Sequence, residues 1–99
     1  MTKQISASHI LISTENLPPD EAQHKIKKLK LRISQGETFA QVAREASNCP
    51  SSARGGSLGS FAKGQMVPEF EEVAFALEPG EISDPVKTEF GYHLILRQT

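Results

Sequence analysis

The chain's single cysteine, Cys49, and two of its three histidines, His9 and His93, carry side chains suited to nucleophilic, acid–base or metal chemistry. A cysteine nucleophile with a histidine base needs these residue types, and so does a zinc site with three protein ligands. No CxxC or HxxxH pair occurs, and no local motif accompanies Cys49. A packing or supporting role is therefore favoured, because a histidine within a strand is most often a core residue, while the nucleophile and the metal site stay open.

The stretch from Ser47 to Phe70 holds four of the seven glycines and raises the question of a phosphate-binding loop. Its segment "ARGGSLGS" lacks the GxxxxGK[ST] spacing and leads into a predicted strand, so no helix N-terminus would face an anion. Glycines that permit tight turns are the favoured interpretation. Met66 and Phe70 lie four residues apart at the start of a predicted helix, where they can meet as core residues or line an apolar pocket.

Two alternating, apolar segments predict the strands that carry the histidines. Residues 5–13 place His9 on the same face as Ala7 and Leu11, and residues 92–97 place His93 on the same face as Ile95. Weaker strands are predicted in "SLGSF" (57–61) and "EISDPV" (81–86), the latter stopped by Pro85.

Three helices are predicted between these strands. The first begins at Pro18-Pro19, with acidic residues in its first turn, and ends at Gly36. The second begins at Thr38, which forms a capping-box pattern with Gln41. The third begins at Pro68 and ends at Pro79-Gly80. The order β-α-α-β-α-β-β predicts an α+β fold, an antiparallel sheet with helices packed around it, in a single domain of residues 1–99.

The composition excludes several classes of protein. Hydrophobic residues make up 37%, charged residues 23%, and the net charge of −1 gives no general attraction to nucleic acid or membranes. No apolar run reaches the ~20 residues of a membrane span, and the N-terminal apolar stretch is too short and polar for a signal peptide. One cysteine excludes an internal disulfide. We expect a cytoplasmic monomer, or a domain excised from a longer protein. The lysine-rich run at residues 25–32 is typical of a solvated helix face, with partner binding left open.

Three segments together resemble the parvulin family of peptidyl-prolyl cis/trans isomerases: "ASHILI", "CPSSARGGSLGSFAKGQMVPEFEEVAFAL" and "PVKTEFGYHLI". The resemblance covers nearly the whole chain in the right order. It implies a four-stranded antiparallel sheet surrounded by helices, in which His9 and His93 lie side by side on the two central strands. It implies no cofactor, no metal and proline-containing polypeptides as substrates.

The resemblance also implies roles for individual residues. Polar active-site positions fall on His9, Cys49, Thr88 and His93, and the substrate-proline pocket falls on Leu58, Phe61, Met66, Phe70 and Phe90. The implied mechanism is non-covalent: the pocket holds the proline ring while the preceding carbonyl rotates. A proline-peptide-binding chaperone module with little turnover is the alternative, and a cysteine hydrolase is a third. The loop "STENLPPDE" lacks the basic cluster of the family's phosphate-directed branch and carries Glu15, Asp20 and Glu21 instead.

Overall fold

The computed structural model describes residues 4–99, so the first three residues of the predicted 1–99 domain lie outside the described residues. Its sheet has the order β2-β1-β4-β3, and every pairing is antiparallel. The strands are β1 (Gln4–Ser13), β2 (Ser57–Ala62), β3 (Val86–Thr88) and β4 (Gly91–Arg97). The two strands that carry the histidines are therefore the central pair, and the predicted α+β class and element order are confirmed.

Three α-helices cover the sheet: α1 (Pro19–Ser34), α2 (Phe39–Ala46) and α3 (Pro68–Ala76). A short 3₁₀ helix, η1 (Pro50–Arg54), follows α2 and was not predicted from the sequence. Prolines occupy the first turn of α1 and α3, where a missing N–H costs nothing. At α2, the Thr38 hydroxyl accepts a hydrogen bond from the Gln41 N–H, which confirms the predicted N-cap.

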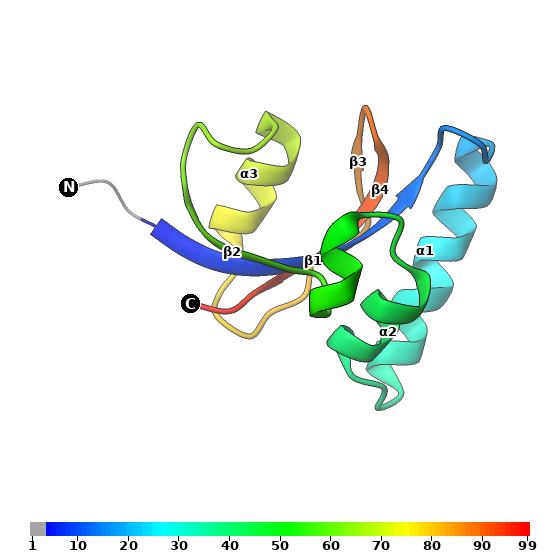
Figure 1. Ribbon diagram of the computed structural model, residues 1–99, viewed down its shortest axis with the longest axis horizontal. Coiled ribbons are helices and arrows are strands. Elements are labelled where there is room, and N and C mark those ends of the chain that lie inside the picture. Colours follow the sequence, from blue (N-terminus) through cyan, green and yellow to red (C-terminus); the bar gives the residue numbers. More distant parts are fainter. Residues whose placement is uncertain (1–3) are drawn as a thin grey trace.

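Alternation along the central strands divides the core into two clusters. Ile10 and Ile12 pack with Leu94 against α1 and α2, whereas Ile5, Ala7 and Ile95 pack against α3. Figure 1 shows α3 beside the N-terminal half of β1, with α1 and α2 beside its other end. His9 and His93 belong by alternation to the face that α3 covers.

The third strand differs from the prediction. Residues 81–85 do not belong to it. Ile82 makes one isolated bridge to Leu96, and the regular strand begins after Pro85, at Val86. The reason is that Pro85 has no N–H to donate and restricts the backbone of the residue before it. Pro85 therefore marks where regular pairing starts, not where it stops.

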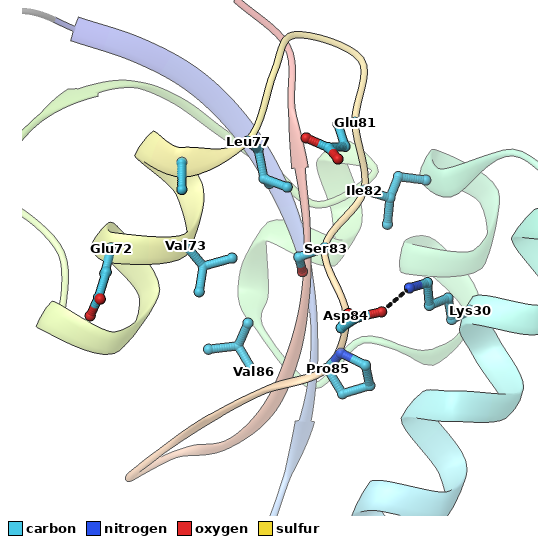
Figure 2. Close-up of a pocket in the computed structure, with 11 residues that line it drawn as sticks. Lys30, Glu72, Val73, Leu77, Glu81, Ile82, Ser83, Asp84, Pro85 and Val86 are labelled. Atoms are coloured by element: carbon cyan, nitrogen blue, oxygen red, sulfur yellow. Dashed lines mark hydrogen bonds and ion pairs between the residues drawn. The ribbon is translucent and has the colours of Figure 1, made fainter.

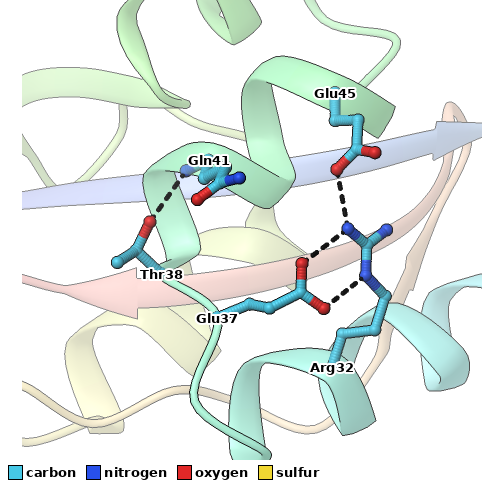
Figure 3. A network of polar contacts seen from close by, with 5 residues as sticks. All are labelled: Arg32, Glu37, Thr38, Gln41 and Glu45. Atoms are coloured by element: carbon cyan, nitrogen blue, oxygen red, sulfur yellow. Dashed lines mark hydrogen bonds and ion pairs between the residues drawn. The ribbon is translucent and has the colours of Figure 1, made fainter.

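An ion-pair network ties the end of α1 to α2. The Arg32 guanidinium donates two hydrogen bonds to Glu37, at 2.8 and 2.7 Å, and a third to Glu45 at 2.6 Å (Figure 3). Two residues before Arg32 in α1, Lys30 forms an ion pair with Asp84. Two of the five basic residues in the 25–32 run thus have carboxylate partners within the domain.

Candidate active site

Two buried histidine rings contact each other between the central strands. Across the β1–β4 pair, His93 lies opposite Leu11 and His9 lies opposite Ile95, so the histidines are diagonal neighbours, not a directly opposed pair. Their Nδ1 atoms are 3.1 Å apart, and the ring planes are inclined by 21°. The predicted contact between the two rings is therefore confirmed, with a diagonal register.

Thr88 extends this contact into a chain of hydrogen bonds. Its Oγ1 lies 2.8 Å from the other ring nitrogen of His93, Nε2, and accepts a hydrogen bond from the Phe90 N–H at 3.2 Å. A hydroxyl has one donor hydrogen and two acceptor lone pairs, so Thr88 can accept from Phe90 and at the same time donate to His93 Nε2. His93 then donates from Nδ1 to Nδ1 of His9.

This direction leaves fewer polar groups without partners than the reverse direction does. The reverse would make Thr88 Oγ1 accept twice and leave its own hydroxyl hydrogen without an acceptor. In the preferred direction one group remains, the Nε2–H of His9, and that nitrogen is buried without a partner among residues 4–99. The site therefore presents a neutral histidine pair that ends in one unused donor.

Burial keeps both rings uncharged near neutral pH. His9 and His93 are 6% and 4% exposed. Burial lowers the pKa of His9 from 6.5 to about 4, and burial together with the neighbouring His9 lowers the pKa of His93 to about 4. The two imidazoles therefore line the site as uncharged polar groups.

Aromatic residues form the floor beneath the histidines. The Phe70 ring, from the first turn of α3, meets both imidazoles edge to face with centroid distances of 5.6 Å. Phe61 of β2 lies 6.2 Å from Phe70, and Leu58 and Met66 pack, half-buried, against the same cluster. The structure thus brings together four of the five predicted proline-pocket residues.

An irregularity in β2 places Leu58 in this cluster. Between the pairs Ser6–Ser60 and Ser8–Ser57, β1 advances by two residues and β2 by three, so β2 holds one extra residue opposite Ala7. Such a bulge changes the direction of the side chains around it. Just before β2, the Gly56 carbonyl accepts a hydrogen bond from the His9 N–H at 2.9 Å, which also holds β2 against β1. A Cβ at Gly56 would lie 2.3 Å from the His9 oxygen, so this glycine is required for close approach.

Cys49 is half-buried at the start of η1, outside the hydrogen-bond chain. The preceding residues attach this segment to β1: Ser47 Oγ accepts from the Leu11 N–H, and the Asn48 N–H donates to the Leu11 carbonyl. The Cys49 backbone is thereby held near the strand of His9. Its thiol makes no hydrogen bond to any residue between 4 and 99, so no hydrogen-bonded thiol–imidazole pair is present in that part of the chain.

Phe90, the fifth predicted pocket residue, lies apart from the aromatic floor. It is 53% exposed in the turn between β3 and β4, and it lines a cavity of about 480 Å³. The carboxylates of Glu15 and Glu89 line the same cavity, along with Asn48 and the end of β1. Phe90 therefore borders a cavity that is also lined by two acidic residues.

Comparison with known proteins supplies the family. Residues 9–99 match the model of the rotamase family described as the PPIC-type PPIase domain. The chain belongs to this rotamase family. It is 47% identical over 93 residues to the foldase protein PrsA of Geobacillus kaustophilus, covering 93% of this chain and 30% of that protein. Identity to the chaperone SurA of Cupriavidus metallidurans is also 47% over 93 residues, covering 93% of this chain and 19% of that protein.

Solved structures agree with this assignment. The rotamase superposes on the solution structure of NmPin, the parvulin of Nitrosopumilus maritimus, with a TM-score of 0.78 and 41% identity. That match covers 100% of this chain and 99% of NmPin. By contrast, the chain spans less than a third of the two curated relatives named above. The domain is a peptidyl-prolyl isomerase of the parvulin type.

The rotamase has another hollow, which is separate from the histidine site. It measures about 690 Å³ and lies between α3 and residues 81–86, with the Lys30–Asp84 pair on its rim (Figure 2). Within residues 4–99 no group of three metal-ligating side chains is found, and no helix is long and apolar enough to cross a membrane. The histidine site is the one that combines buried polar groups with an aromatic floor.

Sequence reasoning missed several supports of the rotamase site. The ties from Ser47 and Asn48 to β1, the close approach at Gly56 and the bulge in β2 were not foreseen. Only the paired glycines "GG" and the polar run "SN" before Cys49 hinted at them. All of these contacts join residues more than 30 positions apart or depend on register, which a local pattern does not encode.

Proposed function

We propose that this domain accelerates cis/trans rotation about X–Pro bonds of protein substrates by a non-covalent mechanism, with the proline ring held by Leu58, Met66 and Phe70. The observation that supports this most directly is the neutral chain Thr88–His93–His9 packed on Phe70. Its members are buried, mutually hydrogen-bonded and uncharged. They are suited to shaping a dry pocket.

The physical demand of the reaction fits such a pocket. Rotation about the amide has a barrier of ~18–20 kcal/mol because twisting destroys the resonance of the peptide bond. An acceleration of about 10⁴-fold needs about 5.5 kcal/mol of differential stabilisation. The twisted amide is less polar than the planar one, so a site of low polarity favours it. Holding the proline ring fixed while the preceding carbonyl rotates supplies a further part of this stabilisation.

The histidine chain has a supporting role in this proposal. With its direction set by Thr88, the Nε2–H of His9 is the only donor of the chain left unused by residues 4–99. Because that nitrogen is buried, in this proposal it sets the shape and polarity of the site and does not contact the substrate. Cys49 contributes a polar side chain at the pocket wall and forms no covalent bond to the substrate.

We further propose that the domain does not select phosphorylated substrates. The cavity beside Phe90 is lined by Glu15 and Glu89, and no lysine or arginine of residues 4–99 lines it. A different cavity, which shares Glu15, is also lined by Lys25. A phosphate carries about −1.5 to −2 charge near neutral pH and needs Arg or Lys within hydrogen-bond reach. An uncharged residue before proline suits the rim formed by Phe90.

The runner-up function is a proline-peptide-binding chaperone module with little turnover. The names of the relatives, a foldase and a chaperone, favour keeping it. A protease-coupled assay on a prolyl peptide, with binding measured in parallel by NMR titration, separates the two. Acceleration that is lost in Phe70→Ala supports the isomerase. Binding at the histidine site without acceleration would establish the module instead.

For partners and location we propose proline-containing polypeptides met by a monomer in the cytoplasm. The lone, half-buried thiol of Cys49 suits a reducing compartment. Sedimentation at increasing protein concentration tests the monomer, and fractionation of cells that express the tagged full-length protein tests the compartment.

A further inference from the structure

The loop that carries Met66 has few apolar anchors of its own. It joins β2 to α3 and consists of residues 63–67, the first three of which, Lys63, Gly64 and Gln65, are exposed. Only Met66 and Val67 pack, half-buried, against the cluster of Phe61 and Phe70. Polar contacts must therefore fix the tip of the loop.

Glu71 makes the contact that joins this tip to α3. Its Oε2 accepts a hydrogen bond from the Gly64 N–H at 2.5 Å, seven residues back along the chain. Three further contacts act on the loop. Gln65 Oε1 accepts from the Ala62 N–H at 2.6 Å, and the Gln65 N–H donates to the Ala62 carbonyl at 3.4 Å. Lys63 Nζ lies 5.5 Å from the Phe75 ring centroid. Of these, only the Glu71 bond is charge-assisted and spans the whole loop.

The conformation of Gly64 is suited to this bond. Its φ of +94° is one that residues with a Cβ rarely adopt, and it turns the chain at the tip of the loop. Glu71 forms no ion pair with any cation among residues 4–99, so its carboxylate is committed to the loop amide. In the sequence, Met66 lies between the two residues that this bond joins.

We infer that Glu71 is a positioning residue for catalysis: it holds the 63–67 loop on α3 and so sets Met66 against Phe70 as one wall of the proline pocket. This inference rests on the proposed proline pocket. Without the bond, the loop tip is free to move away and the half-buried Met66 moves with it. The pocket for the proline ring then widens, while the hydrogen bonds of the histidines on β1 and β4 stay unchanged.

The test compares Glu71→Ala with Glu71→Gln and Glu72→Ala. The glutamine keeps an acceptor oxygen, and Glu72 is an exposed neighbour with no hydrogen bond or ion pair among the described residues, so it controls for the lost charge. We expect Glu71→Ala to raise KM for a prolyl peptide about three- to tenfold, with kcat within twofold of wild type. Glu71→Gln should recover KM to within about twofold, and Glu72→Ala should leave it unchanged.

Two NMR measurements separate positioning from general stability. Glu71→Ala should shift the Gly64 amide and the Met66 methyl signal but not the His9 and His93 ring signals. Wild-type protein should show a through-hydrogen-bond coupling between the Gly64 nitrogen and the Glu71 side-chain carboxyl carbon, a measurement that does not depend on any variant folding. Absence of that coupling, or equal KM values for Glu71→Ala and Glu72→Ala in active protein, would overturn the inference. Lack of acceleration by wild-type protein would instead defeat the proposed function.

Discussion

Replacing Thr88 by valine tests whether the hydroxyl directs the histidine chain. Valine has nearly the shape of threonine, so no cavity is created, but the bond of 2.8 Å to His93 Nε2 is lost. The Phe90 N–H loses its acceptor as well. Thr88 and His93 are both buried, so the imidazole nitrogen is left without a partner.

The expected cost follows from these two bonds. A buried polar group left without a partner costs about 1–3 kcal/mol, and we expect the free energy of unfolding to fall by that amount. If the substitution also raises the activation free energy of the reaction by about 1–2 kcal/mol, kcat/KM falls about 5- to 30-fold. Thr88→Ser keeps the hydroxyl and should stay within about threefold of wild type.

The measurements are a protease-coupled assay, urea unfolding and ¹⁵N spectra of the histidine rings. In wild type the spectra should show His93 protonated at Nδ1 and His9 at Nε2. Thr38→Val is a matched control, because Thr38 caps α2 and touches none of the site residues; it should lower stability by about 1 kcal/mol and leave kcat/KM unchanged. Retention of wild-type kcat/KM and of both ring tautomers in Thr88→Val would refute the reasoning.

Three other predictions follow from the same geometry. Cys49→Ser should stay folded and keep measurable isomerase activity, whereas Phe70→Ala, which removes the ring beneath both imidazoles, should lose much more; complete loss in a folded Cys49→Ser protein would restore the covalent mechanism. Peptides with phosphorylated Ser or Thr before proline should have kcat/KM no higher than unphosphorylated ones at low salt, where charge effects are largest; a preference of tenfold or more would show that a cation such as Lys25 reaches the phosphate. Stability should fall as the pH is lowered from about 6.5 to about 4, because the unfolded imidazoles, with pKa 6.5, take up protons before the buried pair, with pKa about 4. The slope is at most about 1.4 kcal/mol per pH unit for each histidine, and urea unfolding at a series of pH values checks it; a flat profile over this window would mean that the rings are not buried as neutral groups.

Local pattern determined much of the fold. Alternation assigned both strong strands and placed His9 and His93 on the face that α3 covers, and prolines marked the starts of α1 and α3. These features depend on neighbours within a few residues, which the sequence states directly. The three family motifs added the expectation that the two histidine strands are the central pair of the sheet, and named the residues expected to line the proline pocket.

Tertiary structure decided the details that make the site specific. The register of β1 against β4 made the histidines diagonal neighbours, and the short edge strand began after Pro85 instead of before it. Strand register depends on a partner far away in sequence, and a three-residue edge strand carries too little pattern to be located. The direction of the hydrogen-bond chain depends on the hydrogen bond that the Phe90 N–H donates to Thr88 Oγ1. The low pKa of the histidines depends on their burial in the folded chain. The alternation in the sequence chose which face carries the histidines; only the folded chain determines how deeply they are buried, what they contact and whether they stay neutral.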